Sequence, residues 1–210
     1  MPDTVMIAML VVLAYLAGSI SFAVLVSRVY GLPDPRAYGS GNPGATNVLR
    51  SGRKSAAVLT LLGDAVKGWL PVLLAAHWAA DRTEWAMALA AVAAVLGHLY
   101  PVFHGFRGGK GVATALGALA GLSGYLALAV VAGWIVIAIF FRYSSLASMI
   151  AAASAVFYVA ILFSPAHPFF PAVLVLAVLL IWRHRPNIRN LLAGTEKKIG
   201  AKAVPPSNGS

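Results

Sequence analysis

Seven apolar runs separated by short polar connections limit what this chain can fold into. They cover Val5–Ser27, Ser55–Ala80, Trp85–Leu99, Val112–Gly121, Tyr125–Phe141, Leu146–Phe163 and Phe169–Trp182. Several approach the roughly 20 residues that a membrane-spanning helix needs, whereas the fourth run is short. At 60% hydrophobic and 10% charged residues, the chain carries more apolar surface than a soluble domain of this length can bury. We therefore predict an all-α integral membrane protein with seven membrane helices, at least one of them short.

The Lys and Arg residues of the polar connections alternate along the chain. The first, third and fifth connections and the C-terminal segment are basic, and they include Arg50, Lys110 and Arg142. The fourth connection, GLSG, and the sixth, SPAHP, contain no Lys or Arg, and acidic neighbours balance Arg82 in the second. Because Lys and Arg are enriched in cytoplasmic connections, we expect an outside N-terminus, a cytoplasmic C-terminus and a cytoplasmic location for all odd-numbered connections.

Part of this basic charge needs no role beyond contact with lipid headgroups. We interpret the following residues as such anchors: Arg28, Arg36, Lys197, Lys198 and Lys202. The net charge of +10 then reflects membrane topology, and we expect no nucleic-acid partner. No internal repeat or separate soluble domain is visible. Residues 1–200 are predicted to form a single transmembrane domain, and residues 201–210, which contain Pro, Ser and Gly, a disordered tail.

The first polar stretch reads GSGNPGATNVLRSGRK, residues 39–54. Ser40 and Asn47 offer neutral hydrogen-bonding groups, and Arg50 offers a planar fork that suits bidentate capture of a phosphate or carboxylate. A turn rich in Gly, Pro and Asn before a helix would also explain the glycines. It would not explain why similar stretches recur in two other basic segments.

The second polar stretch, GFRGGKGVATALG, places glycines and Lys110 directly before a helix-like run. Glycines let a backbone approach an anion closely, and free N–H groups at a helix N-terminus favour negative charge. The stretch is not a Walker A motif, because Gly111 follows Lys110 where that motif needs Ser or Thr. It predicts an anion site without favouring an ATPase.

The third polar stretch, RHRPNIRN, follows the last apolar run. His184 and Asn187 would share a face if the backbone were helical, but Pro186 leaves the local geometry open. Arg183 and Arg185 are interpreted as interfacial anchors.

Other chemistries lack the residues on which they depend. Without cysteine, thiolate catalysis and Cys-ligated metals are excluded. The six acidic residues offer no carboxylate pair among the cytoplasmic connections, and the five histidines show no metal-ligand spacing. We expect neither a metal nor a cofactor. Asp64 and Lys67, three residues apart within an apolar run, are expected to form a structural ion pair, and the GALAG run Gly117–Gly121 a helix-packing face.

A cationic, amide-rich site at the membrane surface suits a phosphorylated and partly apolar substrate. Reaction chemistry there would depend on positioning and electrostatic stabilisation. A transporter for a phosphorylated solute would also use short, glycine-broken helices, although the candidate ligands gather at one face rather than at the midplane. A lipid-binding scaffold would not need Lys110 and Arg50 beside a glycine-rich turn. The residues alone leave enzyme and transporter open.

The stretches GSGNPGATNVLR, LGHLYPVFHGFRGGKGVATALG, RYSSLAS and RHRPNI followed by a Glu together resemble the bacterial acyl-phosphate:glycerol-3-phosphate acyltransferases. The resemblance extends from about Gly18 to Ile199. It implies transfer of a fatty acyl group from acyl phosphate to the 1-hydroxyl of sn-glycerol 3-phosphate, giving lysophosphatidic acid at the start of phospholipid synthesis. It also implies a bacterial inner-membrane location with a cytoplasmic active site, and coupling to the enzyme that makes acyl phosphate.

The resemblance further implies roles for individual residues. The catalytic set would be Lys110, Arg50, Asn187 and His184. The substrate-binding set would be Ser40, Asn47, Gly108, Gly109, Gly111, Thr114 and Ser145. We expect direct attack by the acceptor hydroxyl, with either His184 or the donor's own phosphate taking the proton. The phosphate is preferred, because the sequence offers no carboxylate that would orient His184.

Overall fold

The computed structural model describes residues 3–79 and 82–200, and the regular structure of those residues is helical. The helices are α1 Asp3–Gly18, α2 Phe22–Val29, α3 Ala45–Leu49, α4 Lys54–Trp78, α5 Thr83–Leu99, the short 3₁₀ helix Val102–His104, α6 Val112–Leu122, α7 Gly124–Phe141, α8 Ser144–Phe163, α9 Phe169–Arg183 and α10 Arg185–Leu192. The prediction of an all-α fold is confirmed. The expected tail, residues 201–210, lies outside the described residues.

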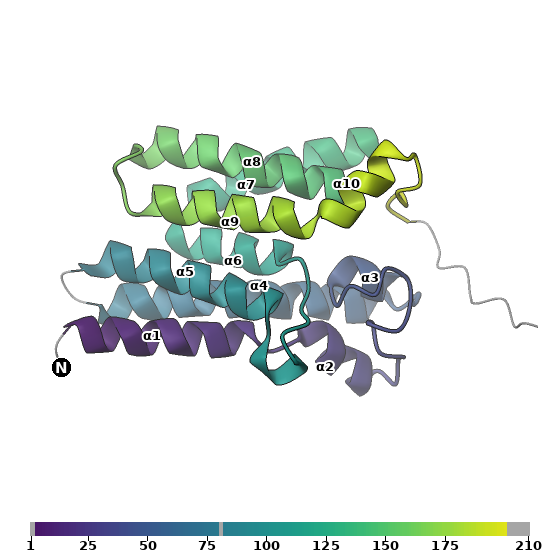
Figure 1. Cartoon of the computed structure of the whole chain (residues 1–210), viewed down its shortest axis with the longest axis horizontal. Helices are drawn as coiled ribbons and strands as arrows, with labels where there is room; N and C mark the ends of the chain where they lie inside the picture. Colours follow the sequence, from purple (N-terminus) through teal and green to yellow (C-terminus); the bar gives the residue numbers. More distant parts are fainter. Residues whose placement is uncertain (1–2, 80–81, 201–210) are drawn as a thin grey trace, which may run out of the picture.

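The long helices form a bundle in which α1, α4 and α5 lie in one layer and α7, α8 and α9 in another (Figure 1). The short helix α6 lies between them and contacts members of both layers. Its neighbours bury a continuous apolar core that includes Val72, Leu99 and Leu126. The short apolar run predicted from the sequence therefore forms α6, the central helix of the bundle.

Four helices in the described residues are long and apolar enough to cross a membrane: α4, α5, α7 and α8. Two bent pairs, α1 with α2 and α9 with α10, would raise this number to six. The helix α6, with 11 residues, is shorter than a span requires. Each apolar run thus forms a helix or a bent pair, while crossing by all seven stays a prediction.

The first apolar run, Val5–Ser27, forms two helices, α1 and α2, rather than one continuous helix, and its crossing as a single span stays a prediction. The chain bends by 42° between α1 and α2, in the segment that contains Ser19 and Ile20. Close packing accompanies this break, because a Cβ on Gly18 would lie 2.0 Å from the Ala94 carbonyl oxygen of α5. Within this break the Ile20 carbonyl accepts a hydrogen bond from the Lys67 side chain of α4.

Glycines also bring α4 and α6 into direct backbone contact. A Cβ on Gly117 would lie 1.9 Å from the Ala65 carbonyl oxygen, and one on Gly68 would lie 2.0 Å from the Thr114 carbonyl oxygen. Small residues permit such approaches between membrane helices. The prediction that Gly117–Gly121 is a packing face is confirmed.

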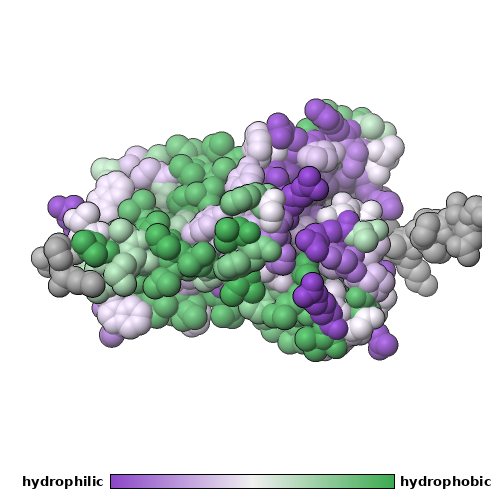
Figure 2. Space-filling view, turned by 60° about the horizontal axis from the view of Figure 1, so that its bottom comes forward, coloured by the Kyte–Doolittle hydropathy of each residue, from purple (hydrophilic) through white to green (hydrophobic). Residues whose placement is uncertain are grey.

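The outer surface separates an apolar body from a polar end (Figure 2). Large apolar side chains such as Tyr125, Leu128 and Phe140 are at least two-thirds exposed, as expected for contact with lipid rather than water. Hydrophilic residues gather at the end where α3 and α10 lie in Figure 1.

Candidate active site

The three polar stretches converge at this polar end, although they come from distant parts of the chain (Figure 1). The Lys110 ammonium group donates a hydrogen bond of 2.5 Å to the Asn187 side-chain carbonyl. The Arg183 guanidinium donates to the carbonyls of Gly109 and Gly108, at 3.2 and 2.8 Å. The second stretch, between α5 and α6, is thereby joined to the third, on α10.

These contacts correct the interpretation of Arg183 as an interfacial anchor. Its guanidinium faces the protein and also lies 5.6 Å from the centre of the Tyr100 ring. Arg185 does face outward, with its guanidinium 4.1 Å from the Trp182 ring centre. The difference arises because Arg183 ends α9 on the face toward the glycine-rich loop, whereas Arg185 starts α10 on the other side of a 54° bend.

The glycines of the second stretch have a different role from the one expected. The Gly108 and Gly109 amides donate to the Leu99 and His98 carbonyls at the end of α5, at 3.2 and 3.1 Å. A Cβ on Gly108 would lie 2.0 Å from the His98 carbonyl oxygen, so the site admits only glycine without displacement. The hydrogen-bonding capacity of these two amides is therefore used within the protein.

Lys110 is the main cation of this convergence. Burial lowers the pKa of Lys110 to about 8, the charge of Glu196 acts in the opposite direction, and those of Arg50 and Arg183 lower it further. The amine is thus cationic at neutral pH but loses its proton more readily than an ordinary lysine. The site has more positive than negative charge and suits an anionic ligand.

Glu196 is the residue that sequence reasoning missed. Its carboxylate oxygen accepts hydrogen bonds from Ser145 Oγ at 2.5 Å and from Asn187 Nδ2 at 2.7 Å. Because Asn187 Nδ2 donates to Glu196, the Asn187 carbonyl is turned toward Lys110. Glu196 is a single carboxylate that orients Asn187 and makes no hydrogen bond to His184, and the available signal was the Glu that closes the third quoted stretch.

The first stretch contributes a loop that Asn47 holds together. Asn47 is 2% exposed, its side-chain carbonyl accepts from the Ser40 amide at 2.9 Å, and its Nδ2 donates to the Pro35 carbonyl at 2.7 Å. Its side chain shapes the loop rather than facing an open site. Arg50, at the end of α3, lies near enough to Lys110 for its charge to lower the pKa of that lysine.

Two other predicted site residues are buried in the wall of the site. His184 is 2% exposed, and its Nδ1 donates to the Leu180 carbonyl at 2.7 Å, which leaves Nε2 with the lone pair. Thr114 is fully buried in the first turn of α6. Pro186 does not interrupt the third stretch, because it lies in the first turn of α10, where proline is tolerated.

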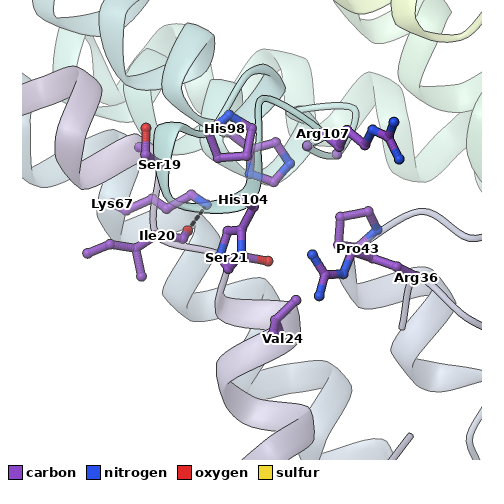
Figure 3. A pocket seen from close by; sticks show the side chains of 14 residues that line it. Ser19, Ile20, Ser21, Val24, Arg36, Pro43, Lys67, His98, His104 and Arg107 are labelled. Atoms are coloured by element: carbon purple, nitrogen blue, oxygen red, sulfur yellow. Dashed lines mark hydrogen bonds between the residues drawn. The ribbon is translucent and has the colours of Figure 1, made fainter. Parts of the chain in front are cut away.

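A small cavity of about 10 Å³ lies on the other side of the glycine-rich loop, with Lys67 and His98 at its base and Arg36 and Arg107 among its lining residues (Figure 3). Such a volume admits about one water molecule and no phosphate. Arg36 is also paired with Asp34, at 2.6 Å. Within residues 3–79 and 82–200, no three His, Asp or Glu side chains gather into a group that would hold a metal ion.

Comparison with known proteins identifies the family to which this architecture belongs. Residues 8–194 match the family model of glycerol-3-phosphate acyltransferase. The chain is 61% identical over 198 residues to the glycerol-3-phosphate acyltransferase of Ralstonia nicotianae, a match that covers 92% of this chain and 94% of that protein. It is 57% identical over 205 residues to that of Bordetella petrii, with 96% and 97% covered.

Solved structures share the fold as well. The crystal structure of PlsY (YgiH), an integral membrane glycerol 3-phosphate acyltransferase, in its glycerol 3-phosphate form has a TM-score of 0.86 and 42% identity, covering 92% of this chain and 96% of that one. Its lysophosphatidic acid form has a TM-score of 0.84 and 41% identity, with 92% and 95% covered. The resemblance seen in the sequence motifs is confirmed, and this chain belongs to the glycerol-3-phosphate acyltransferase family of integral membrane proteins.

Proposed function

We propose that this protein transfers a fatty acyl group from acyl phosphate to the 1-hydroxyl of sn-glycerol 3-phosphate, giving 1-acylglycerol 3-phosphate and inorganic phosphate. The named relatives are glycerol-3-phosphate acyltransferases, and the two forms of the related crystal structure carry the acceptor and the product of this reaction in their names. The observation that carries the proposal is the Lys110–Asn187–Glu196–Ser145 chain of hydrogen bonds beside Arg50. It joins the glycine-rich loop, the first turn of α8, α10 and the segment after α10 into a cationic site at one end of an apolar bundle.

The proposed reaction needs positioning more than a dedicated acid or base. The acceptor hydroxyl oxygen attacks the acyl carbonyl carbon, and the bond between that carbon and the phosphate oxygen breaks. The departing phosphate takes the hydroxyl proton, so a covalent acyl-enzyme is not needed. Lys110 and Arg50 screen the repulsion between the two phosphates and stabilise the negative charge that develops.

The structure supports the phosphate of the acyl donor, rather than a protein side chain, as the proton acceptor. The Nδ1–H of His184 donates to a neutral backbone carbonyl rather than to a carboxylate that would stabilise the protonated ring, and Glu196 already accepts two hydrogen bonds through one oxygen. We assign the Glu196 carboxylate to orienting Asn187, and the four residues Lys110, Arg50, Asn187 and Ser145 to the surroundings of the reacting groups.

We also propose seven crossings, an outside N-terminus and a site facing the cytoplasm of the bacterial inner membrane, where a partner enzyme would supply acyl phosphate. Apart from the bent pair α1 and α2, successive long helices of the bundle and the short α6 run in alternating directions (Figure 1), which supports this topology. The chain has no cysteine, so Ala166→Cys and Lys197→Cys provide single labels at opposite ends. In intact cells an impermeant maleimide should label the first variant alone, and labelling of Lys197→Cys would overturn the orientation.

The donor is tested with purified protein in lipid, labelled glycerol 3-phosphate and a metal chelator. Palmitoyl phosphate is supplied to one sample and palmitoyl-CoA to another. We expect labelled lysophosphatidic acid from the acyl phosphate sample only, and none from Lys110→Ala. Product from palmitoyl-CoA would overturn the donor assignment, and no product from either donor in folded protein would direct attention to solute uptake.

A further inference from the structure

A second polar cluster lies inside the bundle, beneath the glycine-rich loop. Asp64 and Lys67 of α4 are 2% and 5% exposed, and the Lys67 ammonium group lies 2.8 Å from the Asp64 carboxylate. The expected structural ion pair is confirmed. Lys67 also donates to the Ile20 carbonyl, which the break between α1 and α2 leaves free (Figure 3).

The cluster continues from α4 to α5 and α6. His98 Nδ1 lies 3.7 Å from the Asp64 carboxylate, and Thr114 Oγ1 lies 3.1 Å from the same nitrogen. Asp64, Lys67, His98 and Thr114 are all at least nine-tenths buried, and we call these four side chains the buried clamp. It connects α4, α5 and α6 with the break between α1 and α2.

His98 and Thr114 stand at the two ends of the loop that carries Lys110. The His98 carbonyl accepts from the Gly109 amide, and a Cβ on Gly109 would lie 2.3 Å from His98 Nε2. The imidazole therefore packs directly on the backbone next to Lys110. Thr114 lies in the first turn of α6, immediately after the loop. One hydrogen bond thus ties the helix before the loop to the helix after it.

Stability alone is a poor reason for this cluster. A buried ion pair is often no more stabilising than apolar side chains of the same volume, since desolvation offsets the attraction. The backbones of α4 and α6 already pack tightly against each other at Gly68 and Gly117. A role in geometry explains why charged and hydroxyl groups occupy positions that packing could fill.

We propose that the buried clamp fixes both ends of the glycine-rich loop and so holds Lys110 in reach of Asn187. Its members are positioning residues, which touch neither substrate nor reacting atoms. This includes Thr114, which the sequence motif alone suggested as a substrate ligand. The effect on activity rests on the proposed function, whereas the effect on the loop does not.

The test uses Thr114→Val, which keeps the volume and removes the hydroxyl. The matched control is Thr60→Val, since Thr60 is also fully buried but its hydroxyl donates only to the Ala56 carbonyl of its own helix. Amide hydrogen exchange of the purified protein in lipid is measured for residues 105–111 and for α7. We expect about tenfold faster exchange of the loop in Thr114→Val, with α7 and the control variant unchanged.

Steady-state kinetics provide the second readout. Thr114→Val should raise KM for a phosphate-bearing substrate about tenfold with a smaller change in kcat, and Thr114→Ser should restore the original value. His98→Gln removes the same contact from α5, and the double variant should be no worse than the more affected single variant.

Either of two results would overturn the proposal. One is loop exchange in Thr114→Val and His98→Gln that equals that of the unchanged protein. The other is an equal effect of Thr60→Val. Faster loop exchange in a protein that makes no lysophosphatidic acid would support the clamp and contradict the proposed function, so the two failures are distinguishable.

Discussion

Lys67 is buried and Lys110 is partly buried, and the charge of a carboxylate acts on each, yet their surroundings differ in charge and in origin. Lys67 faces Asp64 one turn away on the same helix, and the pair is neutral. Lys110 faces an amide on α10, and Arg50, Arg183 and Lys110 together outnumber Glu196. Asp64 neutralises the charge of Lys67, whereas the positive charge around Lys110 remains available to bind an anion. Lys110 is therefore a candidate for binding an anion, because its neighbours come from distant segments of the chain, whereas Lys67 is neutralised by a carboxylate of its own helix.

The largest expected difference between the two lysines concerns activity. Lys110→Ala should lower kcat/KM by about 10²–10³-fold, because this is the usual loss when one preorganised group is removed from a site that stabilises developing anionic charge. Lysophosphatidic acid formation in lipid-reconstituted protein measures it. Unchanged thermal unfolding would show that the loss is chemical, and a loss below tenfold would contradict the role given to Lys110.

Lys67 is instead expected to affect mainly the free energy of unfolding. Lys67→Met leaves the Asp64 carboxylate buried without its partner, and we expect a loss of about 3–5 kcal/mol in the free energy of unfolding. The double variant Asp64→Leu, Lys67→Met should recover most of that stability, because it removes both charges. Denaturant unfolding in mild detergent measures both. If the single and double variants were equally destabilised, the unpaired Asp64 charge would not be the cause of the loss in stability.

The pH dependence of activity should report Lys110. Its pKa of about 8 in the free protein means that the cation is present below this pH and is lost above it. We therefore expect kcat/KM to fall about tenfold per pH unit above pH 8. Lys110→Arg, if active, should abolish this decline, because Arg stays charged throughout the range. A decline that persists in the arginine variant would assign it to another group.

The smallest effect is expected at His184. His184→Gln keeps a donor for the Leu180 carbonyl, and if the donor's phosphate takes the proton, turnover should fall only a few-fold with normal acceptor binding. Measurement of kcat and of KM for glycerol 3-phosphate decides this. A drop of about 10²–10⁴ in kcat, as general-base loss causes, would contradict the phosphate as proton acceptor.

Much of the candidate site was readable from the sequence because its residues lie in three compact stretches. Lys110, Asn187 and Ser145 do meet, as the motifs suggested. Glu196 was not assigned, because nothing in a lone acidic residue near a basic tail indicates its partners. The Gly108 and Gly109 amides were also misjudged, since a glycine that faces an anion and one that packs on a helix are identical in sequence.

The sequence by itself determined the helices and the apolar exterior of this protein. Each spanning segment must satisfy its own backbone hydrogen bonds within lipid, so apolar composition and run length are sufficient to find it. Tertiary structure alone decided where the first run breaks, which carbonyls hold the glycine-rich loop and which carboxylate orients Asn187. These depend on contacts between segments such as Lys110 and Asn187, 77 residues apart, which no local pattern encodes.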